Sequence, residues 1–135
     1  MDEENIDNLE SLSEYKAYIT ILEWDSDEKK IEAMEKYITN SDYRLHIIKS
    51  FSLAENKVKF LKEIKSGVII DDIVSSINFE NDDQRIEMAR LVEDEFIAYE
   101  IIKLIKDDEK KFEALSMFPS EYYRFAIAYS FKTDE

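Results

Sequence analysis

The chain has 135 residues, of which 44% are apolar and 37% are charged, and its 32 acidic and 18 basic residues give a net charge of −14. One glycine and one proline are too few for the turns of an all-β fold, and the lack of cysteine excludes disulfides and thiolate metal sites. The apolar content is enough for a core, so the composition predicts a folded, all-α protein.

The negative charge limits the partners that the chain can bind. Strong phosphate binding relies on cationic side chains that release counterions, so we expect neither nucleic acid nor an anionic membrane surface as a ligand. A protein of basic character fits the charge better. The acidic first ten residues are unlike a signal peptide, and no apolar run approaches the roughly 20 residues of a membrane span. We therefore expect a cytoplasmic location.

A short pattern recurs along the chain: an acid, a spacer, usually a base, and then an apolar residue with another apolar residue three positions later. It occurs at Glu28–Ile31, Glu55–Val58, Asp83–Ile86 and Glu109–Phe112, with a weaker copy at Glu3–Ile6 that lacks the base. The apolar anchors at 6, 31, 58, 86 and 112 are 25, 27, 28 and 26 residues apart. Such a nearly constant period indicates a repeat protein.

A second pattern follows each copy of the first. A polar residue, an acid and an aromatic residue occur at Ser13-Glu14-Tyr15, Ser41-Asp42-Tyr43, Asp94-Glu95-Phe96 and Ser120-Glu121-Tyr122, and Ser66-Gly67-Val68 is a broken copy. Because the two patterns share one register, they predict an α/α solenoid of about five two-helix repeats of 25–28 residues, with about ten short helices. The predicted repeats form one domain over 1–135, which can be part of a longer array. The repeats span 1–24, 25–51, 52–78, 79–105 and 106–131.

The repeat at 25–51 shows the expected helices best. Ile31, Met34 and Ile38 lie at helical spacing and predict a first helix over about 26–38. A second helix is expected over about 42–51. Ser41, Asp94 and Ser120 are the residues expected to cap second helices, because their side-chain oxygens can accept from unpaired helix N–H groups.

The pattern resembles the short HEAT-like and armadillo-like α-solenoid families. The residues that carry the resemblance are Asp83-Gln84-Arg85-Ile86 with Ala89, and Ser41-Asp42-Tyr43-Arg44 leading into Ile47 and Ile48. The repeats of this chain are shorter than standard HEAT repeats, lack a proline in the first helix and are poorer in alanine. The resemblance implies stacked helix pairs that bind another protein, commonly on the concave face.

Two features of the repeats allow more than one interpretation. The recurrent base at Lys30, Lys57, Arg85 and Lys111 fits a ladder of ion pairs between neighbouring repeats or a plain solvated face. Asp71 falls near the place where other repeats have Leu45, Tyr99 and Phe125. It indicates either a shift of register around Gly67 or a polar position with a role of its own.

The positions that differ between repeats are the candidates for protein binding, since the shared positions serve packing and capping. They are Arg44, His46 and Lys49 in the second repeat and Tyr122, Tyr123 and Arg124 in the last. Tyrosine and arginine are favoured anchors at protein interfaces. Tyr122 and Tyr123 are adjacent, so both cannot face the core of one helix.

These observations predict a non-enzymatic protein-interaction module that uses one helical face, with no cofactor or metal site. Tyr129 and Phe131 give the last repeat little sign of a polar outer face, so the chain either comes from a longer array or self-associates through its C-terminal repeat. An alternative function is an acidic nucleic-acid mimic that blocks a nucleic-acid-binding protein. That function needs carboxylates arrayed on one face.

Overall fold

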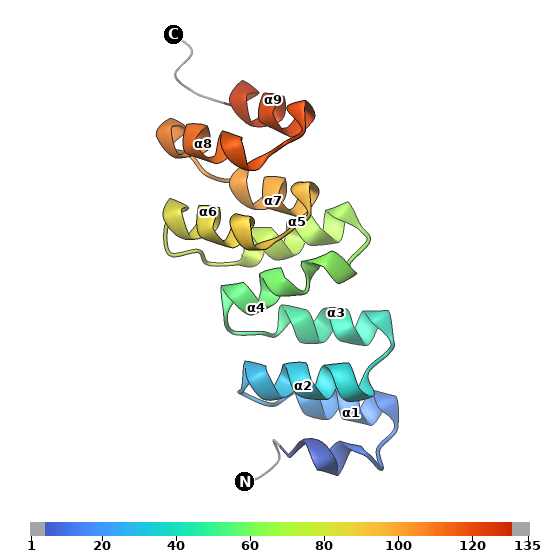
Figure 1. The fold of residues 1–135 in the computed structure, drawn as a ribbon. Coiled ribbons are helices and arrows are strands. Elements are labelled where there is room, and N and C mark those ends of the chain that lie inside the picture. Colours follow the sequence, from blue (N-terminus) through green and yellow to red (C-terminus); the bar gives the residue numbers. More distant parts are fainter. Residues whose placement is uncertain (1–4, 131–135) are drawn as a thin grey trace. The chain divides into compact units, whose positions relative to one another are not determined.

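The computed structural model describes residues 5–130 and is built from short helices (Figure 1). Helix accounts for 71% of it, and residues 5–130 contain no strand, which confirms the all-α prediction. The α-helices are α1 (Glu14–Leu22), α2 (Asp27–Tyr37), α3 (Ser41–Lys49), α4 (Ala54–Lys59), α5 (Gly67–Ser76), α6 (Asp82–Leu91), α7 (Glu95–Ile102), α8 (Asp108–Ala114) and α9 (Glu121–Tyr129). The 3-10 helices are η1 (Ile6–Leu9), η2 (Leu61–Glu63) and η3 (Leu115–Met117).

The chain divides into two compact parts, Met1–Lys57 and Val58–Glu135. The first part holds η1 and α1 to α3, and the second holds η2, α5 to α9 and η3. Helix α4 begins in the first part and ends in the second.

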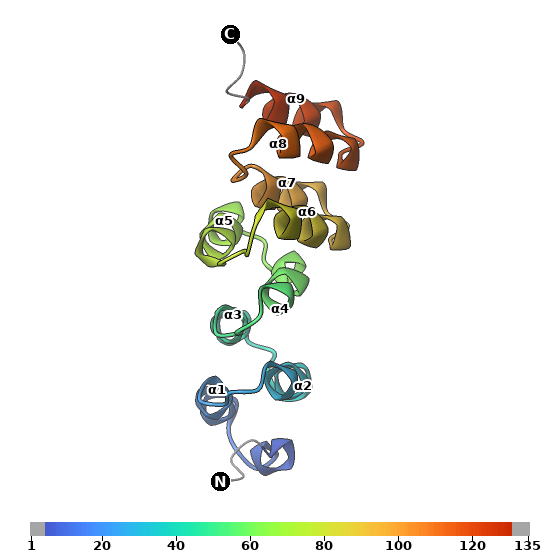
Figure 2. The same ribbon diagram turned by 90° about the vertical axis from the view of Figure 1, so that its left-hand side faces the viewer.

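In the first part, α1 packs on both α2 and α3, and η1 packs on α2 (Figures 1 and 2). Ile21, Met34 and Ile47 are fully buried between these helices. Ile38 is buried as well, whereas Ile31 is half-buried. Helices α2 and α3 therefore agree with the helices expected at 26–38 and 42–51 to within two residues at each end.

In the second part, α7 packs on α5, α6 and α9, and α8 packs on α6 and α9. Contacts thus run from α5 to α7 to α9 and from α6 to α8, so that helices two apart in the chain are neighbours. Ile73, Ile101, Ile102 and Phe118 are among the most deeply buried side chains. These neighbours form two layers, each made of alternate helices.

The first expected helix is the main departure from the ten helices predicted. The described residues before α1 form only the 3-10 helix η1, where the copy of the first pattern lacks the base. Nine α-helices result within residues 5–130. The expected roles of Glu3, Glu4 and Phe131 fall on residues outside the described range.

The predicted helix caps are confirmed in one case and shifted in another. Asp94 accepts from the Ile97 N–H, as expected of an N-cap. In α3 the cap is Asn40, which accepts from two N–H groups, and Ser41 is the first helical residue instead. Ser120 occupies the N-cap position of α9 without a side-chain hydrogen bond.

The recurrent base serves a purpose that neither interpretation of the sequence described. Lys30 and Lys111 are each only 4% exposed, so a solvated face is wrong for both. Lys30 Nζ donates to the carbonyl and hydroxyl of Ser50 at 3.3 and 3.1 Å, and Lys111 Nζ donates to the same groups of Ser130 at 3.1 and 3.2 Å. Each ammonium thus caps the carboxyl end of the next α-helix, where the helix dipole favours a cation.

The other two bases of the series differ from these lysines. Arg85 Nη1 donates to the Ile101 carbonyl at 3.2 Å, near the end of α7, and its guanidinium lies over the Phe79 ring. Lys57 is half-buried. The base before the apolar anchor therefore binds the end of a following helix in three of its four occurrences.

Lys30→Met tests this capping contact, because methionine keeps the apolar stem and removes the ammonium. We expect the free energy of unfolding to fall by about 1–3 kcal/mol, since the half-buried Ser50 carbonyl loses its charged donor. Urea unfolding followed by circular dichroism measures the change. Lys29→Met, at the exposed neighbouring position, serves as the control. If Lys30→Met and Lys29→Met lose equal amounts of unfolding free energy, Lys30 is not the cap of α3.

Candidate protein-binding surface

In residues 5–130, carboxylates join three helix junctions: one uses Asp27 of α2, which accepts from the N–H groups of Ser52 and Leu53 before α4, and two use glutamates. Glu14, the first residue of α1, accepts from the N–H groups of Thr39 and Asn40 at 2.6 and 2.8 Å, at the start of α3. Glu95, the first residue of α7, accepts from the N–H of Ser120 at 3.0 Å, at the start of α9. The donors from Asn40 and Thr39 lower the pKa of Glu14. The acid of the second sequence pattern therefore holds the N-terminus of the neighbouring helix.

The two glutamate junctions each contain a tyrosine pair. Tyr18, the fifth residue of α1, stacks on Tyr43, the third residue of α3, with ring centroids 4.3 Å apart. Tyr99, the fifth residue of α7, contacts Tyr123, the third residue of α9, at 5.4 Å. The junctions α1–α3 and α7–α9 therefore use one set of contacts in one register.

Helices α5 and α7 meet through different side chains. Gly67 begins α5 where α1 and α7 begin with glutamate, and a Cβ there would lie 3.1 Å from Cζ of Phe96. The fifth residue of α5 is Asp71, which pairs with Lys103 at 3.1 Å. This contact replaces the tyrosine pair, so Asp71 is in the normal register and has a polar role.

Lys103 also lies 2.8 Å from Glu100, which is only 4% exposed. Burial is the main cause that raises the pKa of Glu100. Hydrogen bonds from Glu100 and Lys103 lower the pKa of Asp71. The three side chains thus form a cluster at α5 and α7 that extends from the buried Glu100 to the partly exposed Lys103 and Asp71. The pKa directions favour a proton on Glu100 over one on Asp71. The sequence indicated Asp71 alone, because nothing in the pattern pairs it with residues about 30 positions later.

The two predicted arginine anchors bind within their own helix pairs. Arg44 Nη1 donates to the carbonyls of Met34 and Ile38 at 3.2 and 2.8 Å. Arg124 Nη1 donates to the carbonyls of Phe118 and Pro119. Both arginines therefore cap the end of the preceding helix, which accounts for their matching positions. A role in partner binding stays a prediction.

His46 and Lys49 lie on α3 and are both exposed. His46 Nδ1 is 2.5 Å from the Tyr18 hydroxyl, and the two rings lie 5.9 Å apart. Arg44 turns to α2 and His46 to α1, so these two predicted residues do not converge on one exposed surface.

Helix α9 presents an exposed aromatic row. Tyr122, Phe125 and Tyr129 are 70%, 65% and 79% exposed, and the rings of Phe125 and Tyr129 meet at 5.4 Å. Their spacing of three and four residues places them on one side of the helix. Of the predicted pair, Tyr123 is half-buried against Tyr99, and Tyr122 belongs to this row. Phe125 and Tyr129 were missed as site residues, although their helical spacing from Tyr122 was a usable signal.

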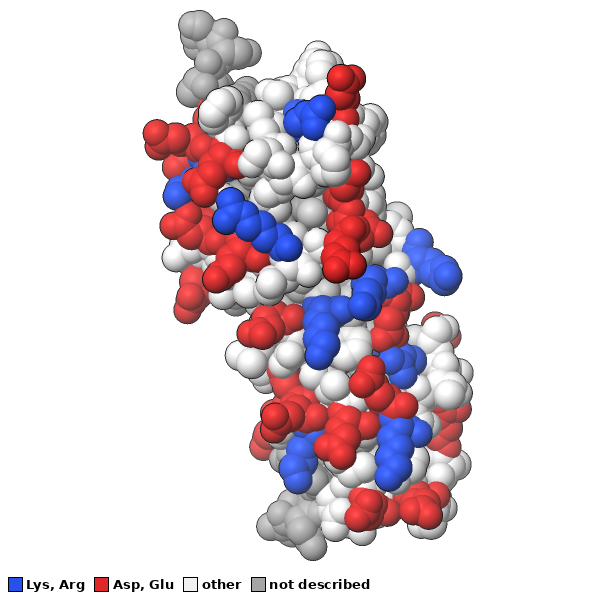
Figure 3. Space-filling view, in the orientation of Figure 1, with Lys and Arg blue, Asp and Glu red and all other residues white. Residues whose placement is uncertain are grey.

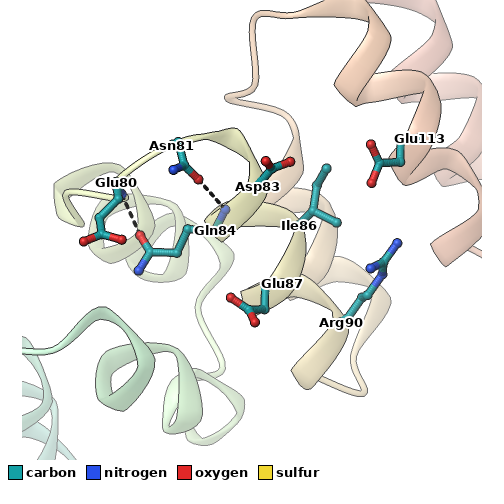
Figure 4. A pocket seen from close by; sticks show the side chains of 8 residues that line it. All are labelled: Glu80, Asn81, Asp83, Gln84, Ile86, Glu87, Arg90 and Glu113. Atoms are coloured by element: carbon teal, nitrogen blue, oxygen red, sulfur yellow. Dashed lines mark hydrogen bonds between the residues drawn. The ribbon is translucent and has the colours of Figure 1, made fainter.

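An open hollow of about 470 Å³ lies on the second part (Figure 4). It is lined by Glu80, Asn81, Asp83, Gln84, Ile86, Glu87, Arg90 and Glu113. Asn81 accepts from the Gln84 N–H, and the Gln84 side chain accepts from the Glu80 N–H. Asp83 pairs with Lys110 at 2.6 Å. The polar side chains of this hollow thus cap the start of α6 and form a surface ion pair. Within residues 5–130, no cluster of three or more His, Asp or Glu side chains is arranged to hold a metal ion.

Comparison with known proteins gives no match to this chain among family models, curated proteins or solved structures. The resemblance to HEAT-like and armadillo-like proteins stays a prediction. In the part of the chain that the structure describes, no helix combines the length and the apolar character needed to cross a membrane.

Glu100→Gln tests the cluster on α5 and α7. A carboxyl group whose pKa is raised by folding stabilises the protein fully below its ordinary value of 4.5, and that contribution is lost as the pH rises through the raised pKa. Glutamine does not titrate. We therefore expect the free energy of unfolding of the variant, relative to the wild type, to increase as the pH rises above 4.5.

Urea unfolding at several pH values measures this difference. Glu87→Gln, at an exposed position on α6, is the control. The pH dependence of its free energy of unfolding should lie closer to that of the wild type. A variant that loses stability relative to the wild type as the pH rises would contradict the proton assignment to Glu100.

Proposed function

We propose that this chain is a non-enzymatic protein-interaction module, a short α-solenoid that binds another protein through one layer of helices. The observation that carries the proposal is the aromatic row of Tyr122, Phe125 and Tyr129 on α9. Exposed apolar patches on a soluble protein mark interaction sites, and tyrosine is a favoured anchor there. Within residues 5–130 the three rings remain 70%, 65% and 79% exposed on one side of α9.

The contacts within each part support the solenoid proposal. Alternate helices are neighbours, as α1–α3 and as α5–α7–α9, and two of these junctions use the same carboxylate and tyrosine contacts. Repeat proteins stack similar units so that each contacts only its neighbours.

The charge of the chain supports a partner of basic character. A net charge of −14 attracts a cationic partner over a distance and raises its association rate. Glu121 begins α9 beside the aromatic row, so a carboxylate accompanies the apolar surface. Self-association through α9 is a related proposal, because a second copy also offers an apolar face.

The nucleic-acid mimic has the net charge as its only support. On the face shown in Figure 3, Lys and Arg side chains lie among the Asp and Glu side chains of both parts. A mimic of a phosphate backbone needs a continuous series of carboxylates. We therefore favour the protein-interaction module.

Capture from native cells with the full chain as bait, read by quantitative mass spectrometry, tests the proposal. We expect the triple variant Tyr122→Ser, Phe125→Ser and Tyr129→Ser to reduce recovery of the specific partner at least about tenfold, because hot-spot aromatics dominate interface energy. The control variant carries Val68→Ser and Leu91→Ser, which change apolar residues that are 79% and 67% exposed on α5 and α6. Equal recovery with both variants would exclude α9 as the binding surface.

A further inference from the structure

The two similar junctions define one way in which an α-helix of this chain receives its neighbour. The receiving helix supplies a glutamate at its first position and an aromatic residue at its fifth, as in Glu14 with Tyr18 and in Glu95 with Tyr99. The incoming helix supplies the backbone N–H of its N-cap residue and a tyrosine at its third position. Both junctions join the N-terminal turns of two helices that run side by side in the same direction.

Helix α9 carries the receiving pair, and no helix within residues 5–130 covers it. Glu121 is its first residue and Phe125 is its fifth. Both are exposed, and Glu121 makes no hydrogen bond or ion pair with any residue in 5–130. The neighbouring Tyr122 and Tyr129 extend the apolar surface along the helix. α9 therefore repeats the surface that α1 offers to α3 and that α7 offers to α9.

We propose that α9 binds the N-terminal end of an α-helix of a partner protein, in the register by which α3 docks on α1. The carboxylate of Glu121 accepts from the N–H of the partner's N-cap residue, and the ring of Phe125 packs on an aromatic side chain at the partner's third helical position. This inference rests on the proposed function, since it specifies how the same surface selects its partner.

Charge complementarity supports a helix N-terminus as the occupant. The unpaired N–H groups there carry about half a positive charge, so they attract a carboxylate. The N-terminus of a partner helix therefore offers a partial positive charge to Glu121 even if the helix has no net charge. In the chain itself, Glu14 binds two such N–H groups with no basic side chain involved.

A second copy of the chain fits this surface less well. Its α1 presents Lys16 at the third position, where the two internal junctions have tyrosine. In a two-fold pair of α9 helices, the antiparallel arrangement brings Glu121 to the C-terminal end of the other helix, which carries the negative end of the dipole. A partner helix with an aromatic third residue matches both the Glu121 carboxylate and the Phe125 ring.

A stapled peptide of residues 38–51, the chain's own α3, is the probe for this proposal. A hydrocarbon bridge replaces the side chains at positions 45 and 49, which lie on the opposite side of the helix from Tyr43, and holds the peptide helical. Fluorescence anisotropy measures its binding to the full chain. We expect saturable binding that Glu121→Gln and Phe125→Ser each weaken about tenfold.

Changes in the peptide test the two contacts from the other side. N-methylation at Asn40 removes the donor, and Tyr43→Ala removes the ring. Each is expected to weaken binding to the wild-type chain about tenfold. N-methylation should have little further effect on Glu121→Gln, because the same hydrogen bond is already lost.

The control chain carries Glu113→Gln, which removes an exposed carboxylate of α8 and should bind like the wild type. Four results overturn the proposal: no saturable binding below about 1 mM; equal binding of a scrambled peptide; binding weakened by Glu14→Gln but not by Glu121→Gln, which indicates exchange with the chain's own α3; or a dimer in sedimentation analysis that Phe125→Ser converts to a monomer.

The two proposals fail in different ways. If the triple variant of α9 loses its native partner while the stapled peptide fails to bind, α9 is the interaction surface and the helix register is wrong. If the peptide binds as expected and the native partner is captured equally by the triple variant, α9 accepts helices but the partner in the cell uses another surface.

Discussion

The capping of helix ends by side chains from neighbouring helices is the interaction on which the rest of this structure depends. The α-helices have only 6 to 11 residues, and each leaves about four N–H and four carbonyl groups unpaired at its ends. Glu14 and Glu95 bind N-terminal groups, whereas Lys30, Lys111, Arg44 and Arg124 bind C-terminal carbonyls. Because helices of this length are marginal alone, the capping contacts also determine which helices become neighbours.

The junctions α1–α3, α5–α7 and α7–α9 use contacts of two kinds. A carboxylate and a pair of tyrosines join α1 to α3 and α7 to α9, whereas Gly67 with Phe96 and Asp71 with Lys103 join α5 to α7. The charged junction includes the buried Glu100, so its strength depends on protonation. The α1–α3 junction contains Glu14 instead, and the N–H groups of Asn40 and Thr39 lower its pKa. The two carboxyl groups therefore affect stability in opposite directions as the pH changes.

Much of the helical layout could be predicted from sequence, because Ile31, Met34 and Ile38 repeat at the helical period and few residues separate one helix from the next. The contacts of the polar residues could not. Lys30 in an acid-spacer-base pattern looks solvated until the neighbouring helix covers its stem, and Arg44 looks like an interface anchor until its carbonyl acceptors are located. Tyr122 and Tyr123 were indistinguishable in sequence, and only the position of Tyr99 separates the exposed ring from the packed one.

The carboxylate contacts at Asn40 and Ser120 have a consequence for how such helices diverge. Glu14 and Glu95 bind main-chain N–H groups, and every residue except proline supplies that donor. In this hydrogen bond only the glutamate depends on residue identity, because any residue except proline supplies the N–H on the incoming helix. The incoming helix can therefore change its sequence at this position while the hydrogen bond that holds it in register is kept.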